Sequence, residues 1–151
     1  MNEQGYEKLE IYRLGYKLAV EIHRITMSLP KFELYEEGGQ IRRSSKSVPA
    51  QIAEGYCLRK NKKEFVQYLN RAYGSVHETV VHLDLLFETR SLADAATYGA
   101  LRSRYDVLCK MIFRFMEGVI EGHGKPGFAR ETDPDFESIP TSLITNPTSR
   151  R

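Results

Sequence analysis

The sequence predicts an all-α protein, an antiparallel up-down-up-down four-helix bundle. Three observations indicate this fold: apolar residues recur at helical spacings in four long segments, no segment alternates as a strand would, and the connections are short, at about 3 to 6 residues. With 151 residues, 41% of them hydrophobic, the chain can bury one sizeable core. We therefore expect a single helical domain.

The first helix is predicted over Tyr6 to Ser28, because an apolar residue recurs once per turn along this segment. Pro30 follows, and a residue before proline is displaced from the helical region of backbone space, so the helix should end near Leu29. Its apolar stripe consists of Ile11, Leu14, Leu18, Ile22, Ile25 and Leu29.

The second helix is predicted from near Glu33 to Gly55 or Cys57. Pro49 lies inside it, and Val48 and Ile52 keep the phase of the residues before the proline, so we expect a kinked but continuous helix. Small residues lie on both faces of this segment: Gly38, Ser45, Ser47 and Ala50. Small residues on both faces predict close neighbours on both faces, and hence contact with another copy of the chain.

The third and fourth helices begin with capping signals. Asn61 and Glu64 match a capping box, so a helix is predicted from there to about Glu88. Asp94 is the expected N-cap of the fourth helix, which should stop at Gly122. The apolar stripes are Phe65, Leu69, Ala72, Val76, Val80, Leu83 and Phe87 in the third helix and Tyr98, Leu101, Tyr105, Leu108, Ile112, Phe115 and Val119 in the fourth.

These four helices predict a bundle domain over residues 1–124. Residues 125–151 contain four prolines and no apolar period, so they cannot bury enough surface to offset the entropy of ordering. We expect a flexible tail that is dispensable for folding and assembly.

The composition favours a cytoplasmic protein with reduced thiols and no membrane partner. No apolar run approaches the length of about 18 residues that a membrane span needs, and the first ten residues do not resemble a signal peptide. Cys57 and Cys109 have no metal-ligand spacing, so we expect no disulfide, no metal and no cofactor. Cys57 is expected to be a buried or half-buried thiol.

The turn between the second and third helices predicts how these two helices align. Residues at equal distances from a turn centred near Arg59 and Lys60 should lie level, which places Ser45 beside Gly74 and Ser75.

The same alignment predicts a structural ion pair. It brings Arg42 and Arg43 close to Glu78, with Glu54 as a further candidate partner of the arginines. We expect such a pair to fix the alignment of the helices.

The segment from residue 42 to residue 63 is the most basic part of the chain. Seven cations stand there against Glu54 alone, which gives a net charge of +6 in 22 residues. One interpretation is a solvated helix end, and the other is a surface that contacts nucleic-acid phosphates. The candidate phosphate-binding residues are Arg42, Arg43, Lys46, Arg59, Lys60, Lys62 and Lys63, with Arg102, Arg104, Lys110 and Arg114 as a second set.

Signals for an enzyme are weak. His77 and His82 are five residues apart, which separates them by about 140° on a helix and excludes the usual metal-binding pair. The sequence contains neither a glycine-rich phosphate loop nor a nucleophile elbow. Tyr12, Tyr16 and Tyr56 fall off the core stripes and are candidates for an interface between copies. We therefore expect no catalytic residues.

Two segments resemble a known family. The stretch QIRRSSKSVPAQIAEG, residues 40–55, and the stretch AYGSVHE, residues 72–78, resemble the signatures of the bacterial proteins encoded in intervening sequences of 23S ribosomal RNA genes. The resemblance covers about residues 7 to 122. It implies a left-handed four-helix bundle, commonly a ring-shaped homopentamer, related to the accessory proteins of diversity-generating retroelements, which bind nucleic acid and a reverse transcriptase.

Two functions remain open at this point. The first is an oligomeric accessory protein that binds RNA or DNA backbones through the basic residues, with a reverse transcriptase or another protein as a further partner that the resemblance implies. The second is a structural or protein-binding scaffold in which the same charges only keep a ring soluble. In neither case does the sequence contain a motif for reading bases, so any binding should depend on shape and charge.

Overall fold

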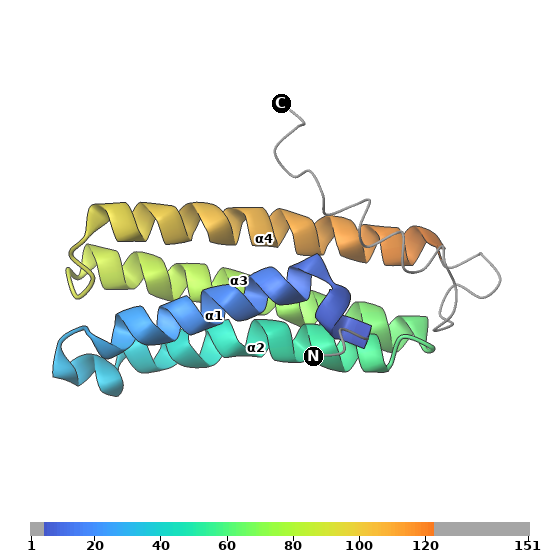
Figure 1. The fold of residues 1–151 in the computed structure, drawn as a ribbon, viewed down its shortest axis with the longest axis horizontal. Coiled ribbons are helices and arrows are strands. Elements are labelled where there is room, and N and C mark those ends of the chain that lie inside the picture. Colours follow the sequence, from blue (N-terminus) through green and yellow to red (C-terminus); the bar gives the residue numbers. More distant parts are fainter. Residues whose placement is uncertain (1–4, 123–151) are drawn as a thin grey trace, which may run out of the picture.

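The computed structural model describes residues 5–122, which form a four-helix bundle (Figure 1). Successive helices run in opposite directions, and the described range contains no strand. The predicted fold class is therefore confirmed. The elements are the short 3-10 helices η1 (Gly5–Lys8) and η2 (Lys31–Leu34) and the long helices α1 (Glu10–Met27), α2 (Glu37–Cys57), α3 (Lys62–Glu88) and α4 (Ala95–Glu121).

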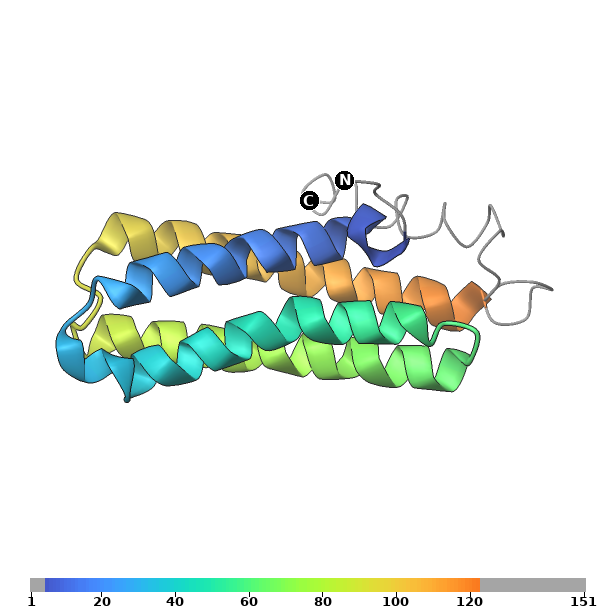
Figure 2. The same cartoon turned by 60° about the horizontal axis from the view of Figure 1, so that its bottom comes forward.

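All four long helices contribute to one apolar core. The apolar stripes predicted from the sequence are largely buried, and burying a Leu, Ile or Phe side chain stabilises the fold by about 1.5 to 3 kcal/mol. Helix α2 packs most extensively against α3, and these two helices lie side by side in Figure 2. Helix α1 packs mainly against α2. The largest fully buried side chains are Tyr105, Phe65, Phe115, Ile11, Leu18, Ile22, Ile41, Ile52, Leu69, Leu83 and Leu86.

The predicted N-caps of α3 and α4 are both present. Asn61 Oδ1 accepts the backbone N–H of Glu64 at 3.3 Å. Asp94 Oδ1 accepts the backbone N–H groups of Ala96 at 3.0 Å and Thr97 at 3.4 Å. The Thr97 hydroxyl donates to the same carboxylate, and these bonds lower the pKa of Asp94 below its ordinary value, the hydroxyl bond most. The sequence signals thus locate both helix starts.

Helices α1 and α2 begin later than predicted. The predicted first turn of α1 forms η1 instead, and the predicted first turn of α2 forms η2. Glu33 explains the second difference, because its buried carboxylate folds back on α2 and accepts the backbone N–H of Gly38 at 2.6 Å. This residue therefore caps the helix from outside instead of starting it.

Helix α2 runs without a break through Pro49, as the apolar phase predicts. Pro49 is buried on the side that faces α1. A Cβ atom at Gly15 of α1 would lie 3.2 Å from Val48 and 3.8 Å from the Pro49 ring. The lack of a side chain at Gly15 therefore lets α1 pack closely against Val48 and Pro49 of α2.

The alignment of α2 and α3 differs from the prediction by about one to two turns. Ser75 donates its hydroxyl hydrogen to Gln51 at 2.8 Å, and Thr79 donates to Ser44 at 2.9 Å, whereas Ser45 had been expected beside Ser75. Side chains lean toward the N-terminus of their helix, which is far from the turn in α2 and next to it in α3. A residue of α2 therefore contacts a residue of α3 that is separated from the turn by more residues than it is itself.

The predicted tail, residues 125–151, lies outside the described residues. Among the helices of residues 5–122, none has the length and apolar character that crossing a bilayer requires.

Candidate functional site

The basic residues predicted to form one cluster lie in two separate places. Arg42, Arg43 and Lys46 belong to the N-terminal half of α2, whereas the other cations surround the α2–α3 turn. Lys46 lies eleven residues before the last residue of α2, a distance of about 16 Å at 1.5 Å per residue. A continuous patch of seven cations is therefore not formed within one copy of the chain.

Arg59 does not present its charge to solvent. Its side chain is only 6% exposed, and its guanidinium carbon lies 4.0 Å from the centroid of the Tyr56 ring. An Nη1 hydrogen is donated to the Tyr56 carbonyl at 3.0 Å. Arg59 thus closes the end of α2, and in this conformation its guanidinium is covered and not presented to a phosphate. Tyr56, predicted as an interface residue, is itself buried.

Arg42 has a structural role that differs from the predicted one. Its Nη2 donates to the carbonyl oxygens of Leu34 at 2.9 Å and Glu33 at 3.2 Å, which ties η2 to α2. Glu78, the predicted partner, contacts His82 instead, with 3.5 Å between its carboxylate and Nε2. Within residues 5–122, Arg42 and Glu78 therefore have different partners, and the predicted ion pair between them is not formed.

Arg43 and Glu54, the other two candidates for the structural ion pair, are both exposed. Arg43 and Glu54 lie on the outer face of α2, and within residues 5–122 neither forms an ion pair. Arg43 thus remains available to a phosphate, unlike Arg42 and Arg59.

The α2–α3 turn carries the most accessible group of cations. Lys60 and Lys63 are exposed and Lys62 is half-buried. Lys62 and Lys63 line a shallow hollow together with Val66 and Ile120. The N-terminus of α3 lies in the same turn, and the aligned peptide dipoles add positive potential there. We define Lys60, Lys62 and Lys63 as the turn lysines.

Two cations of the second predicted set are neutralised by neighbouring carboxylates. Arg102 Nε donates to Asp84 at 3.0 Å, and Nη1 donates to Asp106 at 2.5 Å. Burial is the largest single influence on the pKa of Arg102 and lowers it, but the two carboxylates together raise the pKa above its ordinary value. Arg104 forms an ion pair with Glu21 of α1. These arginines hold the bundle together and do not form a basic surface.

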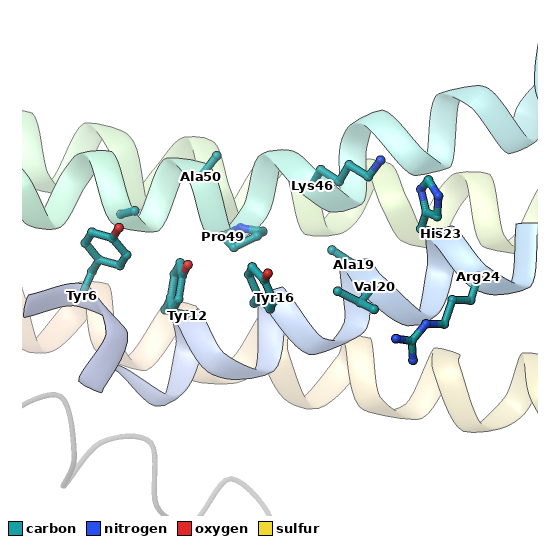
Figure 3. Close-up of a pocket in the computed structure, with 11 residues that line it drawn as sticks. Tyr6, Tyr12, Tyr16, Ala19, Val20, His23, Arg24, Lys46, Pro49 and Ala50 are labelled. Carbon is teal, nitrogen blue, oxygen red and sulfur yellow. The ribbon is translucent and has the colours of Figure 1, made fainter. Parts of the chain in front are cut away.

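An open groove lies on the outer face of α1 and α2, with a volume of about 560 Å³ (Figure 3). Its lining is mostly apolar, and small side chains from both helices leave it open. We call it the α1–α2 groove. Its residues are Tyr6, Tyr12, Tyr16, Ala19, Val20, His23, Arg24, Lys46, Pro49, Ala50 and Ala53.

Three tyrosines form one side of the α1–α2 groove. The ring centroids of Tyr6 and Tyr12 are 4.9 Å apart, and those of Tyr12 and Tyr16 are 5.9 Å apart. Figure 3 shows Tyr12 and Tyr16 pointing from α1 toward Pro49 and Ala50 of α2. Burial, more than the neighbouring tyrosines, raises the pKa of Tyr12 above its ordinary value. The sequence had identified Tyr12 and Tyr16 as interface candidates, and both line the groove.

The cysteines and the acidic side chains form no evident metal centre. Within residues 5–122, no three His, Cys, Asp or Glu side chains gather in an arrangement that could hold a metal ion. Cys57 is exposed, so the prediction that it is a buried or half-buried thiol is wrong. It lies at the end of α2, where the turn toward α3 leaves it uncovered.

Cys109 of α4 and His77 of α3 are in a contact that was not predicted from the sequence. Sγ of Cys109 lies 3.3 Å from Nε2 of His77. The signal was present in the turn between α3 and α4, because equal distances from that turn bring residue 77 within one helical turn of residue 109.

A comparison with protein families agrees with this architecture. The sequence pattern of the 23S rRNA-intervening sequence proteins matches residues 7–114, from η1 through most of α4. No curated protein matches the chain significantly. The family match covers more than two thirds of the 151 residues. The chain therefore belongs to the family of 23S rRNA-intervening sequence proteins.

Proposed function

We propose that this protein is a self-assembling accessory scaffold without catalytic function, and that the assembled form binds nucleic-acid backbones. The observation that carries the proposal is the α1–α2 groove. Exposed apolar surface of this kind is characteristic of protein contacts, and the groove holds about 560 Å³ on the outside of the bundle. Its occupant in this proposal is a second copy of the chain.

The surface of the second copy that suits the groove is a ridge on the outer face of α3. Val81 and Leu85 are 55% and 40% exposed, and Glu78 and Glu88 flank them at helical spacing. We define these four residues as the α3 ridge. Its apolar centre matches the floor of the groove.

The charges of the two surfaces are complementary. The α1–α2 groove carries Arg24 and Lys46, and the α3 ridge carries Glu78 and Glu88. The groove and the ridge are different surfaces, so each copy offers one surface to the copy before it and the other to the copy after it. Such a contact closes into a ring when the rotation allows, and the family resemblance implies five copies.

Assembly is tested by changing each surface separately. The variant V81K/L85K places charge on the α3 ridge, and Ala50→Trp fills the α1–α2 groove. Light scattering at tens of micromolar protein should show that both variants dissociate, while far-ultraviolet circular dichroism shows unchanged helicity. Phe32→Lys is the matched control, because Phe32 is 57% exposed but lies in η2. A parent protein that is monomeric at this concentration contradicts the proposed assembly.

The support for nucleic-acid binding is the position of the turn lysines. They project around the positive end of α3, and a ring repeats them once in each copy. Each phosphate contact releases condensed counterions, so the logarithm of affinity should fall with the logarithm of salt by about 0.7 to 0.9 per contact. Binding of this kind depends on the backbone of RNA or DNA and does not distinguish one base sequence from another.

The test compares two variants with the same loss of charge. K60Q/K62Q/K63Q removes the turn lysines, and K8Q/K17Q/K31Q removes three exposed lysines that are not candidates for phosphate binding. We expect the first to lower both the affinity and the salt slope for single-stranded RNA and DNA, and the second to have a small effect. Equal losses would mean that only net charge matters. A parent protein that does not bind at low salt would leave the scaffold without a nucleic-acid partner, which is the second candidate function.

A further inference from the structure

Cys109 is in contact with two side chains of α3. Its sulfur lies 3.3 Å from Nε2 of His77, and the Tyr73 hydroxyl hydrogen-bonds to the same sulfur. Cys109 is half-buried, whereas His77 is exposed on the surface between α3 and α4. A thiol and an imidazole within hydrogen-bond reach form the basic unit of an activated nucleophile.

The imidazole of His77 is held in position by its neighbour one turn earlier on α3. The ring centroids of Tyr73 and His77 are 4.7 Å apart, with 76° between the planes. The Tyr73 ring is in turn supported by Phe113 of α4, at 5.9 Å between centroids. This arrangement directs Nε2 of His77 toward the sulfur, as a third group does in known nucleophile and base pairs.

The environment keeps the thiol protonated at rest. Burial is the main cause that raises the pKa of Cys109, and the charge of Asp106 adds to it. The Tyr73 hydrogen bond and the charge of Lys110 act in the opposite direction. A thiol that retains its proton can donate it to Nε2 when His77 is neutral and carries its own proton on Nδ1. The sulfur therefore needs a base to react near neutral pH.

We propose that Cys109 is a site of covalent modification by small electrophiles and hydrogen peroxide, with His77 as the general base and Tyr73 as a positioning residue. With an alkyl iodide, a sulfur–carbon bond forms, the carbon–iodine bond breaks, iodide leaves and the thiol proton passes to Nε2. With hydrogen peroxide, the sulfur attacks one oxygen and the oxygen–oxygen bond breaks. The sulfur is oxidised to a sulfenic acid, and the departing hydroxide takes the proton from His77 to form water.

The chain contains its own control for this reaction. Cys57 is exposed at the end of α2, and within residues 5–122 no hydrogen bond to its sulfur is formed. Exposure alone would make Cys57 the faster thiol. A base within reach would make Cys109 faster in spite of its burial, so the order of the two rates separates the two explanations.

The experiment measures alkylation by iodoacetamide between pH 5.5 and 9, with mass spectrometry as the readout. The C57S protein reports on Cys109, and the C109S protein reports on Cys57. At pH 7 we expect Cys109 to react at least about 10-fold faster than Cys57. Its advantage over Cys57 should be greatest at the lower pH values and should shrink toward pH 9, because a general base matters least where hydroxide can remove the thiol proton.

Changes at the two α3 residues test their roles. In the C57S protein, His77→Gln should slow alkylation at pH 7 about 100-fold, at the low end of what a general base contributes, and should slow it by less at pH 9. Tyr73→Ala should slow alkylation at pH 7, because the imidazole loses the ring that positions it, whereas Tyr73→Phe, which keeps the ring, should retain the rate of the C57S protein. His77 is exposed, so His77→Gln should leave the melting temperature unchanged and the comparison valid.

The peroxide reaction is followed by trapping sulfenic acid with dimedone. The C57S protein should be labelled, and the same protein with His77→Gln should not. The proposal is overturned if Cys109 reacts no faster than Cys57 at pH 7, if His77→Gln leaves its rate and pH profile unchanged, or if dimedone labels neither protein.

Discussion

At the scale of single residues, Gly38 of α2 and Gly74 of α3 differ in whether the fold requires a glycine. A Cβ at Gly38 would lie 2.3 Å from the Glu33 carbonyl oxygen, which is closer than real contacts allow. A Cβ at Gly74, on the exposed face of α3, would meet no atom within 4 Å. One glycine is required by a close approach of two backbones, and the other is not.

We therefore predict opposite effects for the same substitution at these positions. Gly38→Ala should lower the free energy of unfolding by about 2 to 3 kcal/mol, because the backbone must shift and the buried Glu33 carboxylate loses its bond. Gly74→Ala should raise it by about 0.5 to 1 kcal/mol through helix propensity alone. Urea denaturation of both variants checks the prediction, and a stabilising Gly38→Ala would contradict the observed packing.

Tyr105 gives a second prediction at this scale. Its side chain is 1% exposed, and its hydroxyl has no hydrogen-bond partner within residues 5–122. Burial, with a smaller contribution from Glu21, raises the pKa of Tyr105. The folded state therefore holds this proton more tightly than the unfolded chain does, and stability should fall as the pH rises above the unfolded value of about 10.

Tyr105→Phe removes both the orphan hydroxyl and this titration. We expect the free energy of unfolding at pH 7 to stay the same or rise by about 1 kcal/mol, since an unsatisfied buried group is deleted. Between pH 10 and 11 the variant should lose less stability than the parent. Urea denaturation at pH 7 and at pH 10.5 distinguishes this outcome from a cavity effect, which would lower stability equally at both values.

At the scale of the helices, the caps explain where α3 and α4 begin. Asn61 accepts one backbone N–H at 3.3 Å, whereas Asp94 accepts two backbone N–H groups and a hydroxyl. We predict that Asn61→Ala costs about 1 kcal/mol. Asp94→Ala should lower the melting temperature by more. Thermal melts followed by circular dichroism at 222 nm test this order. Lys63→Ala is the control, because Lys63 lies in the first turn of α3 and forms no capping hydrogen bond.

The lowered pKa of Asp94 adds a pH dependence to its cap. Because its folded pKa lies below the unfolded value of about 3.8, the stabilisation is complete above that value and is lost as the pH falls through the folded pKa. In the Asp94→Asn protein, the cap should stabilise the fold equally at pH 4.5 and at pH 2.5, because an amide does not titrate. The parent should lose the additional stability between these values.

The helices were predictable from the sequence because their signals are local. The stripe from Phe65 to Leu83 follows from spacing alone, and Asn61 and Asp94 act within three residues of themselves. Arg59 shows the limit of local signals, because in the sequence it is one of several exposed-looking cations. Its burial depends on how the end of α2 packs, which no spacing reveals.

The candidate sites were less predictable because they join distant segments. His77 and Cys109 are 32 residues apart, and their contact depends on the alignment of α3 and α4 to within one turn. The α1–α2 groove depends on side chains that are small on α2 and aromatic on α1. The aromatic half could be inferred from Tyr12 and Tyr16 lying off the core stripe, but the hollow itself is a property of two packed helices.

At the scale of the whole molecule, Glu33 joins the two connections at one end of the bundle. Its Oε2 accepts the backbone N–H of Gly38 at 2.6 Å, and its Oε1 accepts the hydroxyl of Ser91 at 2.9 Å. Ser91 belongs to the connection between α3 and α4. The buried carboxylate of Glu33 therefore links the two connections, although Ser91 lies 58 positions further along the chain than Glu33.

We predict that Glu33→Ala lowers the free energy of unfolding by about 2 to 4 kcal/mol, because hydrogen bonds to a charged group contribute about 1.5 to 3 kcal/mol each and are not additive. Glu36→Ala, at an exposed neighbour, should change it by less than about 0.5 kcal/mol. Amide hydrogen exchange should speed up both at the start of α2 and around Ser91. Faster exchange at only one of these places would show that the two connections are not coupled.

The short turn that joins α2 to α3 has a consequence for how the chain reaches this structure. Only four residues separate the two helices, and these helices pack on each other more than any other pair. Closing so short a loop costs little entropy, and contacts between near neighbours form early in fast-folding helical proteins. We expect the α2–α3 hairpin to form the folding nucleus and α1 to dock later. In stopped-flow measurements, Ala72→Gly should then slow refolding, whereas Ala19→Gly should mainly speed unfolding.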